Sequence, residues 1–73
     1  MEGRHKYTYY NTLSPRQLEA IKLKAEGFTD KEIAARLYIA TSTVKTMLGI
    51  VRDKLLAKNS TEATCICLKR GLI

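Results

Sequence analysis

The chain is short and basic, and its composition excludes several classes of protein. Its 73 residues are enough for one small domain, because a chain of this length buries only about 60% of the surface that its unfolded form exposes. Thirteen Lys and Arg against seven Asp and Glu give a net charge of +6, which favours a polyanionic partner without identifying it. The sequence has no apolar leader and no apolar run near 20 residues, so we expect a cytoplasmic protein with no membrane partner.

Residues that bind metals or perform catalysis are scarce. Cys65 and Cys67 lie two apart in a stretch expected to be helical, so their side chains diverge by roughly 200° and do not readily form a disulfide. With His5 as the only histidine they are a poor zinc-binding set, and we interpret them as small apolar residues in a helix interface. No nucleophile, base and orienting group can be assembled. We therefore expect no enzyme activity, metal site, cofactor or small-molecule ligand.

The first predicted element follows an arm. Residues 1–12 show no helical apolar period and contain three tyrosines, so we expect a flexible arm before a domain at residues 13–73. A helix should begin at Ser14, where a hydroxyl cap, a proline and Gln17 form a capping box, and end at Gly27. Its apolar stripe is predicted to contain Leu18, Ile21, Ala25 and Phe28.

The second and third helices are predicted to be joined by a turn at residues 38–40. The second begins with another capping box, Thr29 with Glu32, and should bury Ile33, Ala34 and Leu37. The third spans residues 41–55, and its apolar residues repeat at helical spacing along one line, which leaves the opposite face free for a ligand. The apolar line is Val44, Leu48, Val51 and Leu55, and the free face carries Ser42, Lys45, Thr46, Gly49, Arg52 and Asp53.

A fourth helix completes an all-α chain. It should begin near Asn59, which forms a capping-box pattern with Glu62, and stop at Gly71. Its apolar set is wide for ten residues, which leaves material for both a core and a subunit contact. This set contains Ala63, Ile66, Cys67 and Leu68.

From Leu13 to Ile73 the chain resembles the LuxR C-terminal DNA-binding domain, also called the GerE or NarL type. The resemblance implies a four-helix bundle containing a helix-turn-helix, in a sequence-specific transcriptional regulator that inserts its third helix into the major groove of double-stranded DNA. The matching residues are Leu13-Ser14-Pro15-Arg16-Gln17-x-Glu19, Ala25-Glu26-Gly27, Thr29-Asp30-Lys31-Glu32-Ile33-Ala34, Leu37-x-Ile39, Thr43-Val44-Lys45-Thr46, Lys54-Leu55 and Ala63.

The resemblance also implies a set of DNA-binding residues. A helix N-terminus offers unpaired amides and a partial positive charge to phosphate, and Lys45 suits either guanine or a phosphate. Each residue has a plainer interpretation: Thr43 could instead be a cap or packing residue, and Lys31, Arg52 and Lys58 could serve solubility, of which only Lys31 is favoured as a phosphate contact. The resemblance places Ser42, Lys45, Thr46 and Gly49 at base edges, and Thr29, Lys31, Thr41 and Thr43 near the phosphate backbone.

Several residues depart from the family pattern. Gly49 stands where a long polar side chain is common, so one base-reading position is empty. Ala40 replaces a usual serine, and we expect Thr41 to take over the capping role. Leu56 replaces the glycine that normally ends the third helix, so this helix is expected to end differently or to run on. Ile50 is an apolar residue beside the DNA-facing stripe.

The resemblance suggests a homodimer formed through the fourth helix, where position favours Thr64, Cys65 and Leu68 at the contact. The chain is interpreted as a stand-alone GerE-like regulator in preference to an excised domain. The alternative is a protein-interaction module that binds RNA polymerase, a sigma factor or another regulator with little specific DNA contact, which Gly49, Ile50 and the tyrosine-rich arm motivate. A sigma-factor region 4 fragment fits the motifs less well.

Overall fold

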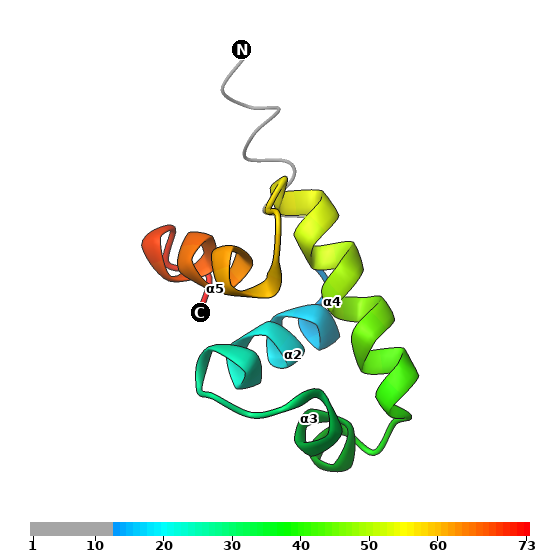
Figure 1. The fold of residues 1–73 in the computed structure, drawn as a ribbon. Coiled ribbons are helices and arrows are strands. Elements are labelled where there is room, and N and C mark those ends of the chain that lie inside the picture. The colour runs from blue at the N-terminus through cyan, green and yellow to red at the C-terminus, as the bar shows by residue number, and fades with distance from the viewer. Residues whose placement is uncertain (1–12) are drawn as a thin grey trace.

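The structure is a computed structural model that describes residues 13–73, and in this range it contains four helices and no strand (Figure 1). The all-α prediction is confirmed, whereas the predicted arm at residues 1–12 lies outside the described residues. The helices are α2 (Pro15–Ala25), α3 (Asp30–Leu37), α4 (Thr41–Leu55) and α5 (Ser60–Lys69).

Two helices begin with the capping boxes that the sequence predicts. At α2, Gln17 N donates to Ser14 Oγ at 3.0 Å, and Ser14 N donates to Gln17 Oε1 at 2.9 Å. At α3, Glu32 N donates to Thr29 Oγ1 at 3.2 Å, and Thr29 N donates to Glu32 Oε1 at 2.8 Å. The hydrogen bonds from the backbone and side chain of Thr29 hold the pKa of the Glu32 carboxyl below its usual value, because they favour its charged form.

The other two helices begin differently from the prediction. At α5, Asn59 Oδ1 accepts from Glu62 N at 2.8 Å, but the Glu62 carboxylate accepts from Lys58 N at 2.7 Å instead of closing a box with Asn59. At α4 the N-cap residue is Ala40, and no side chain caps the helix. The expected capping role of Thr41 is therefore wrong. Thr41 is already the first helical residue, whereas a cap must precede the helix with extended backbone.

All four helices end with the same backbone pattern. A residue with positive φ follows each helix, and the next amide donates to the carbonyl five residues earlier, which is the Schellman motif. The four left-handed residues are Gly27 (φ 98°), Tyr38 (φ 59°), Leu56 (φ 57°) and Gly71 (φ 73°). The four closing hydrogen bonds are Phe28 N to Leu23 O, 3.1 Å; Ile39 N to Ala34 O, 3.0 Å; Ala57 N to Arg52 O, 2.9 Å; and Leu72 N to Cys67 O, 2.9 Å.

Two of these left-handed positions carry large side chains in place of glycine. Helix α4 ends at Leu55, so the expectation that it would end differently or run on is wrong. Leu56 adopts the left-handed conformation despite a cost of about 1–2 kcal/mol, because the closing hydrogen bonds satisfy the last carbonyls. The Leu56 and Tyr38 side chains are 83% and 93% exposed, so burial does not offset this backbone strain.

The hydrophobic core is built on α4. The predicted inward residues of α3 and α4 are all buried, which confirms both patterns. The stripe predicted for α2 is wrong in part: Ala25, the last helical residue, is exposed, whereas Ala20 is fully buried beside Ile21. Helix α2 packs against α3, α4 and α5, and Figure 1 shows it below α5 with its first turn beside α4. The buried residues are Leu13, Ala20, Ile21, Ile33, Ala34, Leu37, Val44, Leu48, Val51, Leu55, Ala63 and Cys67.

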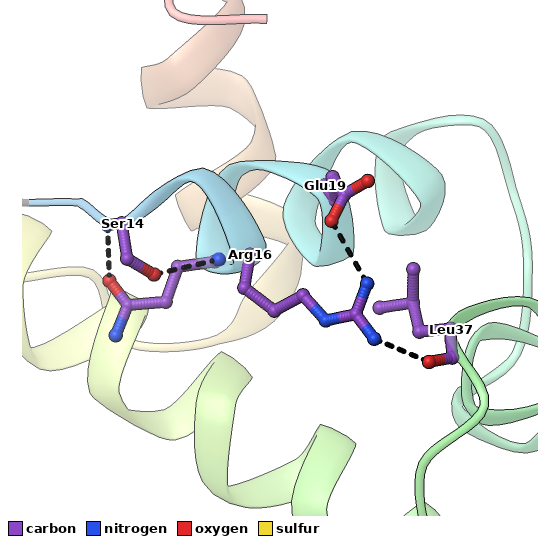
Figure 2. A network of polar contacts seen from close by, with 5 residues as sticks. Ser14, Arg16, Glu19 and Leu37 are labelled. Carbon is purple, nitrogen blue, oxygen red and sulfur yellow. Dashed lines mark hydrogen bonds and ion pairs between the residues drawn. The ribbon is translucent and has the colours of Figure 1, made fainter.

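Polar contacts connect α2 to both ends of α3. The Arg16 guanidinium donates through Nη2 to the Leu37 carbonyl at the end of α3, and through Nη1 to Glu19 Oε1 at 3.2 Å (Figure 2). At the other end of α3, Lys24 Nζ forms an ion pair with Asp30 Oδ1 at 2.9 Å. Arg16 and Lys24 of α2 thus contact opposite ends of α3.

The strain at Leu56 gives a prediction about stability. Replacing Leu56 with Gly should raise the free energy of unfolding by about 1 kcal/mol, since glycine adopts positive φ without the steric cost of a Cβ. In a domain of this size the melting temperature should rise by about 4–8 °C, which thermal unfolding followed by circular dichroism measures.

Gly27→Ala is the matched control, with the opposite expected sign. A Cβ at Gly27 would meet no atom within 4 Å, so its effect isolates the backbone cost of φ +98°. A stability of Leu56→Gly equal to or below that of the wild type would contradict the strain assigned to Leu56.

Candidate nucleic-acid interface

The outer face of α4 is polar and uncovered within the described residues. Figure 1 shows α4 along one edge of the bundle, with the other three helices on one side of it. The buried ridge of α4 faces those helices, while Ser42, Lys45 and Thr46 are exposed and Gly49 is half-buried on the opposite face. The structure therefore brings the four residues predicted at base edges together on one surface of one helix.

The outer face of α4 carries a positive charge at Lys45, which is exposed. Within residues 13–73 the ion pairs join Arg16 to Glu19 and Lys24 to Asp30, and neither involves Lys45. The uncapped start of α4 adds the partial positive charge of a helix N-terminus, with amides that no side chain accepts from. This end of α4 can accept an anion without breaking an existing cap.

The residues predicted near phosphate lie at the starts of α3 and α4. Lys31 is exposed on the first turn of α3, and Thr41 is half-buried at the first position of α4. The Thr29 hydroxyl oxygen accepts from Glu32 N as the α3 cap, which leaves its hydrogen available for donation. Thr43 is exposed and does not cap α4, so the alternative interpretation as a cap or packing residue is wrong.

A shallow depression connects these surfaces. It is lined by residues of α3, α4 and the start of α5: Asp30, Lys45, Leu48, Gly49, Arg52 and Ser60. Asp30 lies between Thr29 and Lys31 in the sequence, so the predicted phosphate contacts of α3 are next to the predicted base contacts of α4. From the sequence, Arg52 was expected to be a surface cation, and no DNA contact was predicted for Ser60. The spacing of Arg52, seven residues after Lys45, was the available signal, whereas the position of Ser60 depends on the packing of α5.

The sequence that forms these helices matches the model of a known protein family. The model of the luxR family of bacterial regulatory proteins, named GerE, matches residues 11–67, which include all of α2, α3 and α4. The chain belongs to the luxR family. Within that family α3, the turn and α4 are the helix-turn-helix, so the prediction of an all-α bundle containing this motif is confirmed.

The relatives that this chain resembles include regulatory proteins of Bacillus subtilis and Staphylococcus aureus. The chain is 40% identical over 63 residues to the uncharacterized transcriptional regulatory protein YvfU of Bacillus subtilis, a match that covers 86% of the chain and 32% of YvfU. It is 35% identical over 65 residues to the transcriptional regulatory protein DesR of the same species, covering 89% of the chain and 33% of DesR. The response regulator protein VraR of Staphylococcus aureus is 33% identical over 64 residues, a match that covers 88% of the chain and 31% of VraR. The chain thus spans about a third of the length of these relatives.

The residues predicted at a dimer contact lie on α5. Cys65 and Leu68 are exposed, Leu68 to 57%, and they are three residues apart on one side of the helix. Thr64 is half-buried, and its Oγ1 donates to the Thr61 carbonyl at 2.7 Å, so its hydroxyl is used within the helix. Cys67 faces the core. The fourth helix of this luxR-family domain therefore has one buried side and one side with exposed apolar groups.

Two further observations concern the part of the chain that the structure describes. No helix in residues 13–73 has both the length and the apolar character needed to cross a membrane. The same residues contain no group of three His, Cys, Asp or Glu side chains placed to hold a metal ion.

The two cysteines are predicted to differ in reactivity. Burial raises the pKa of the Cys67 thiol, because the thiolate is disfavoured away from water, whereas Cys65 is exposed. In native protein at low concentration, a disulfide reagent such as DTNB should label one thiol per chain rapidly, and both thiols after denaturation. Cys65→Ser should remove the rapid phase. Rapid labelling of the folded Cys65→Ser protein would show that Cys67 is not protected.

Proposed function

We propose that this chain is a sequence-specific regulator of transcription that binds double-stranded DNA by inserting α4 into the major groove. The observation that carries the proposal is the division of α4 into a buried apolar ridge and an opposite polar face that carries Lys45. A helix anchored in this way presents one rigid face outward, and a major groove about 12 Å wide admits an α-helix. Membership of the luxR family supports the same function. Such a regulator acts where bacterial DNA lies, in the cytoplasm.

The base contacts are assigned to the outer face of α4. Lys45 donates to O6 and N7 of a guanine, the pairing that suits a cationic donor. Thr46 and Ser42 discriminate less between bases, since a hydroxyl can donate to or accept from several base edges. The threonine methyl can also contact a thymine methyl. Gly49 contributes no side chain, so the sequence discrimination of this protein depends on few contacts.

The phosphate contacts are assigned to the starts of α3 and α4. Lys31 is exposed and cationic, and Thr29, Thr41 and Thr43 supply hydroxyls near two helix N-termini. The uncapped amides of α4 contribute donors and a favourable dipole at the same place. These contacts set the register of the protein on the duplex, and the base contacts then select the sequence.

The protein is proposed to act as a homodimer through α5. The exposed side of α5 carries Cys65 and Leu68, with Thr64 at its edge, and pairing two copies would remove the exposed Leu68 from water. Two-fold helix-turn-helix dimers bind half-sites about 10 base pairs apart. The labelling rate of Cys65 tests this contact, because it should fall as protein concentration rises and dimerisation covers the thiol.

A second candidate function is a protein-interaction module that binds RNA polymerase, a sigma factor or another regulator. The exposure of Tyr38 and Ile50, 93% and 39%, favours it, since both offer apolar surface near the helix-turn-helix. Salt dependence separates the two functions. Binding to phosphates weakens steeply as salt rises, whereas an apolar protein contact responds little.

Removing Lys45 tests the groove placement. A duplex selected by the wild type from a random pool should bind Lys45→Ala less tightly by about 1–3 kcal/mol and with weaker discrimination at one base position. Anisotropy titrations at several salt concentrations measure both effects. Lys22→Ala, which removes an exposed cation from α2, is the matched control and should bind like the wild type. If Lys45→Ala kept both the affinity and the salt slope, α4 would not lie in the groove.

Replacing Thr29 separates its capping role from its proposed DNA contact. Aspartate is at least as good an N-cap as threonine, so Thr29→Asp should keep the stability within about 0.5 kcal/mol. It should nevertheless weaken binding to every duplex, because it places a negative charge against phosphate. Thr29→Ser keeps both the cap and the donor and should bind normally. Wild-type affinity of a folded Thr29→Asp protein would remove Thr29 from the interface.

A further inference from the structure

One of the residues that line the depression beside α4 is a glycine, Gly49. Gly49 lies four residues after Lys45 and three before Arg52, so the three residues share one side of the helix. No positive φ requires a glycine at this position, and glycine within a helix costs about 0.5–1 kcal/mol relative to alanine. The structural feature that remains at this position is the space left by the missing side chain.

That space borders the Arg52 guanidinium. A Cβ placed on Gly49 would lie 3.4 Å from Arg52 Nη2, which is an ordinary contact distance. The guanidinium thus lies beside the backbone of residue 49, and Arg52 is half-buried. A methyl group at position 49 would be tolerated, whereas a longer side chain would compete with the guanidinium for the same place.

The depression also has a defined charge. Its one carboxylate, Asp30, is paired with Lys24 at 2.9 Å, while no carboxylate of residues 13–73 forms an ion pair with Lys45 or Arg52. Two cations therefore determine the local potential, and Ser60, at the start of α5, lines the same depression. The ligand that suits this surface is an anion that accepts several hydrogen bonds.

We propose that Arg52 and Ser60 bind a phosphate of the DNA strand that borders the major groove, and that Gly49 provides the room for this contact. The inference rests on the proposed function, since it adds a residue pair to the same interface. Lys45 and Arg52 are seven residues apart, about 10.5 Å along the helix axis, so Lys45 reaches a base while Arg52 holds the backbone roughly three nucleotides away. Gly49 then acts as a spacer and not as an empty base-reading position.

Salt-dependent titrations test the phosphate contact. Arg52→Ala should weaken binding to the selected duplex and to a random duplex by the same factor, and should lower the slope of log K against log salt by about 0.9, the value for one phosphate. Arg52→Lys keeps the charge and should restore the slope. Lys22→Ala is the control for the loss of one positive charge.

Variants at position 49 test the spacer role. Gly49→Gln should bind as weakly as Arg52→Ala, whereas Gly49→Ala, whose Cβ would lie 3.4 Å from Arg52 Nη2, should lose less affinity than Gly49→Gln. In the double variant Gly49→Gln with Arg52→Ala, the two losses of affinity should not add, because each substitution removes the same phosphate contact. Circular dichroism melting of each variant establishes that it is folded.

Different failures have different meanings. If Lys45→Ala weakens binding while Arg52→Ala matches the wild type in affinity and slope, the groove placement stands and the phosphate contact is wrong. If Arg52→Ala changes preference at particular base pairs, Arg52 reads a base and the inference is overturned. If the wild type shows no salt-dependent affinity for any duplex, the proposed function itself fails.

Discussion

The apolar ridge of α4 is the interaction on which the rest of the structure depends. Val44 and Val51 are fully buried, and Leu48 and Leu55 nearly so, which places one helix against α2, α3 and α5 together. With a core of few residues, such a small domain has little other apolar surface to bury. The same burial fixes the rotation of α4 about its axis. The outward direction of Lys45 and Thr46 therefore follows from packing and needs no contacts of its own.

The sequence predicted the helices well because their signals are local. The capping boxes of Ser14 and Thr29 involve residues three apart, and the ridge of α4 repeats along a single helix. The predictions were wrong where packing against other helices or a competing hydrogen-bond partner determines the local structure. Ala25 lies at the end of α2, beyond the part covered by other helices, and Glu62 bonds Lys58 in preference to Asn59. At Leu56 the closing hydrogen bonds outweighed the conformational preference of the residue.

The candidate site was predictable to the extent that it lies on one helix. The outer face of α4 could be predicted from periodicity, and the family resemblance supplied the residues of α3. The depression that connects them could not be predicted, because Asp30, Arg52 and Ser60 come from three segments whose approach depends on how α3 and α5 pack against α4. The exposed side of α5 is an intermediate case: helical spacing separates Cys67 from Cys65, but it does not show which side meets the core.

The missing side-chain cap at Ala40 bears on both the stability of α4 and its proposed contact with DNA. An acceptor at this position, such as a serine hydroxyl, would satisfy an amide within the protein and typically stabilise the helix by about 1 kcal/mol. The same acceptor would compete with any external oxygen for that amide. With alanine at this position α4 has no side-chain acceptor at its start, and the Thr43 amide donates to the Ala40 carbonyl at 3.0 Å instead. The proposed phosphate contact at the start of α4 would therefore not have to displace a side-chain cap.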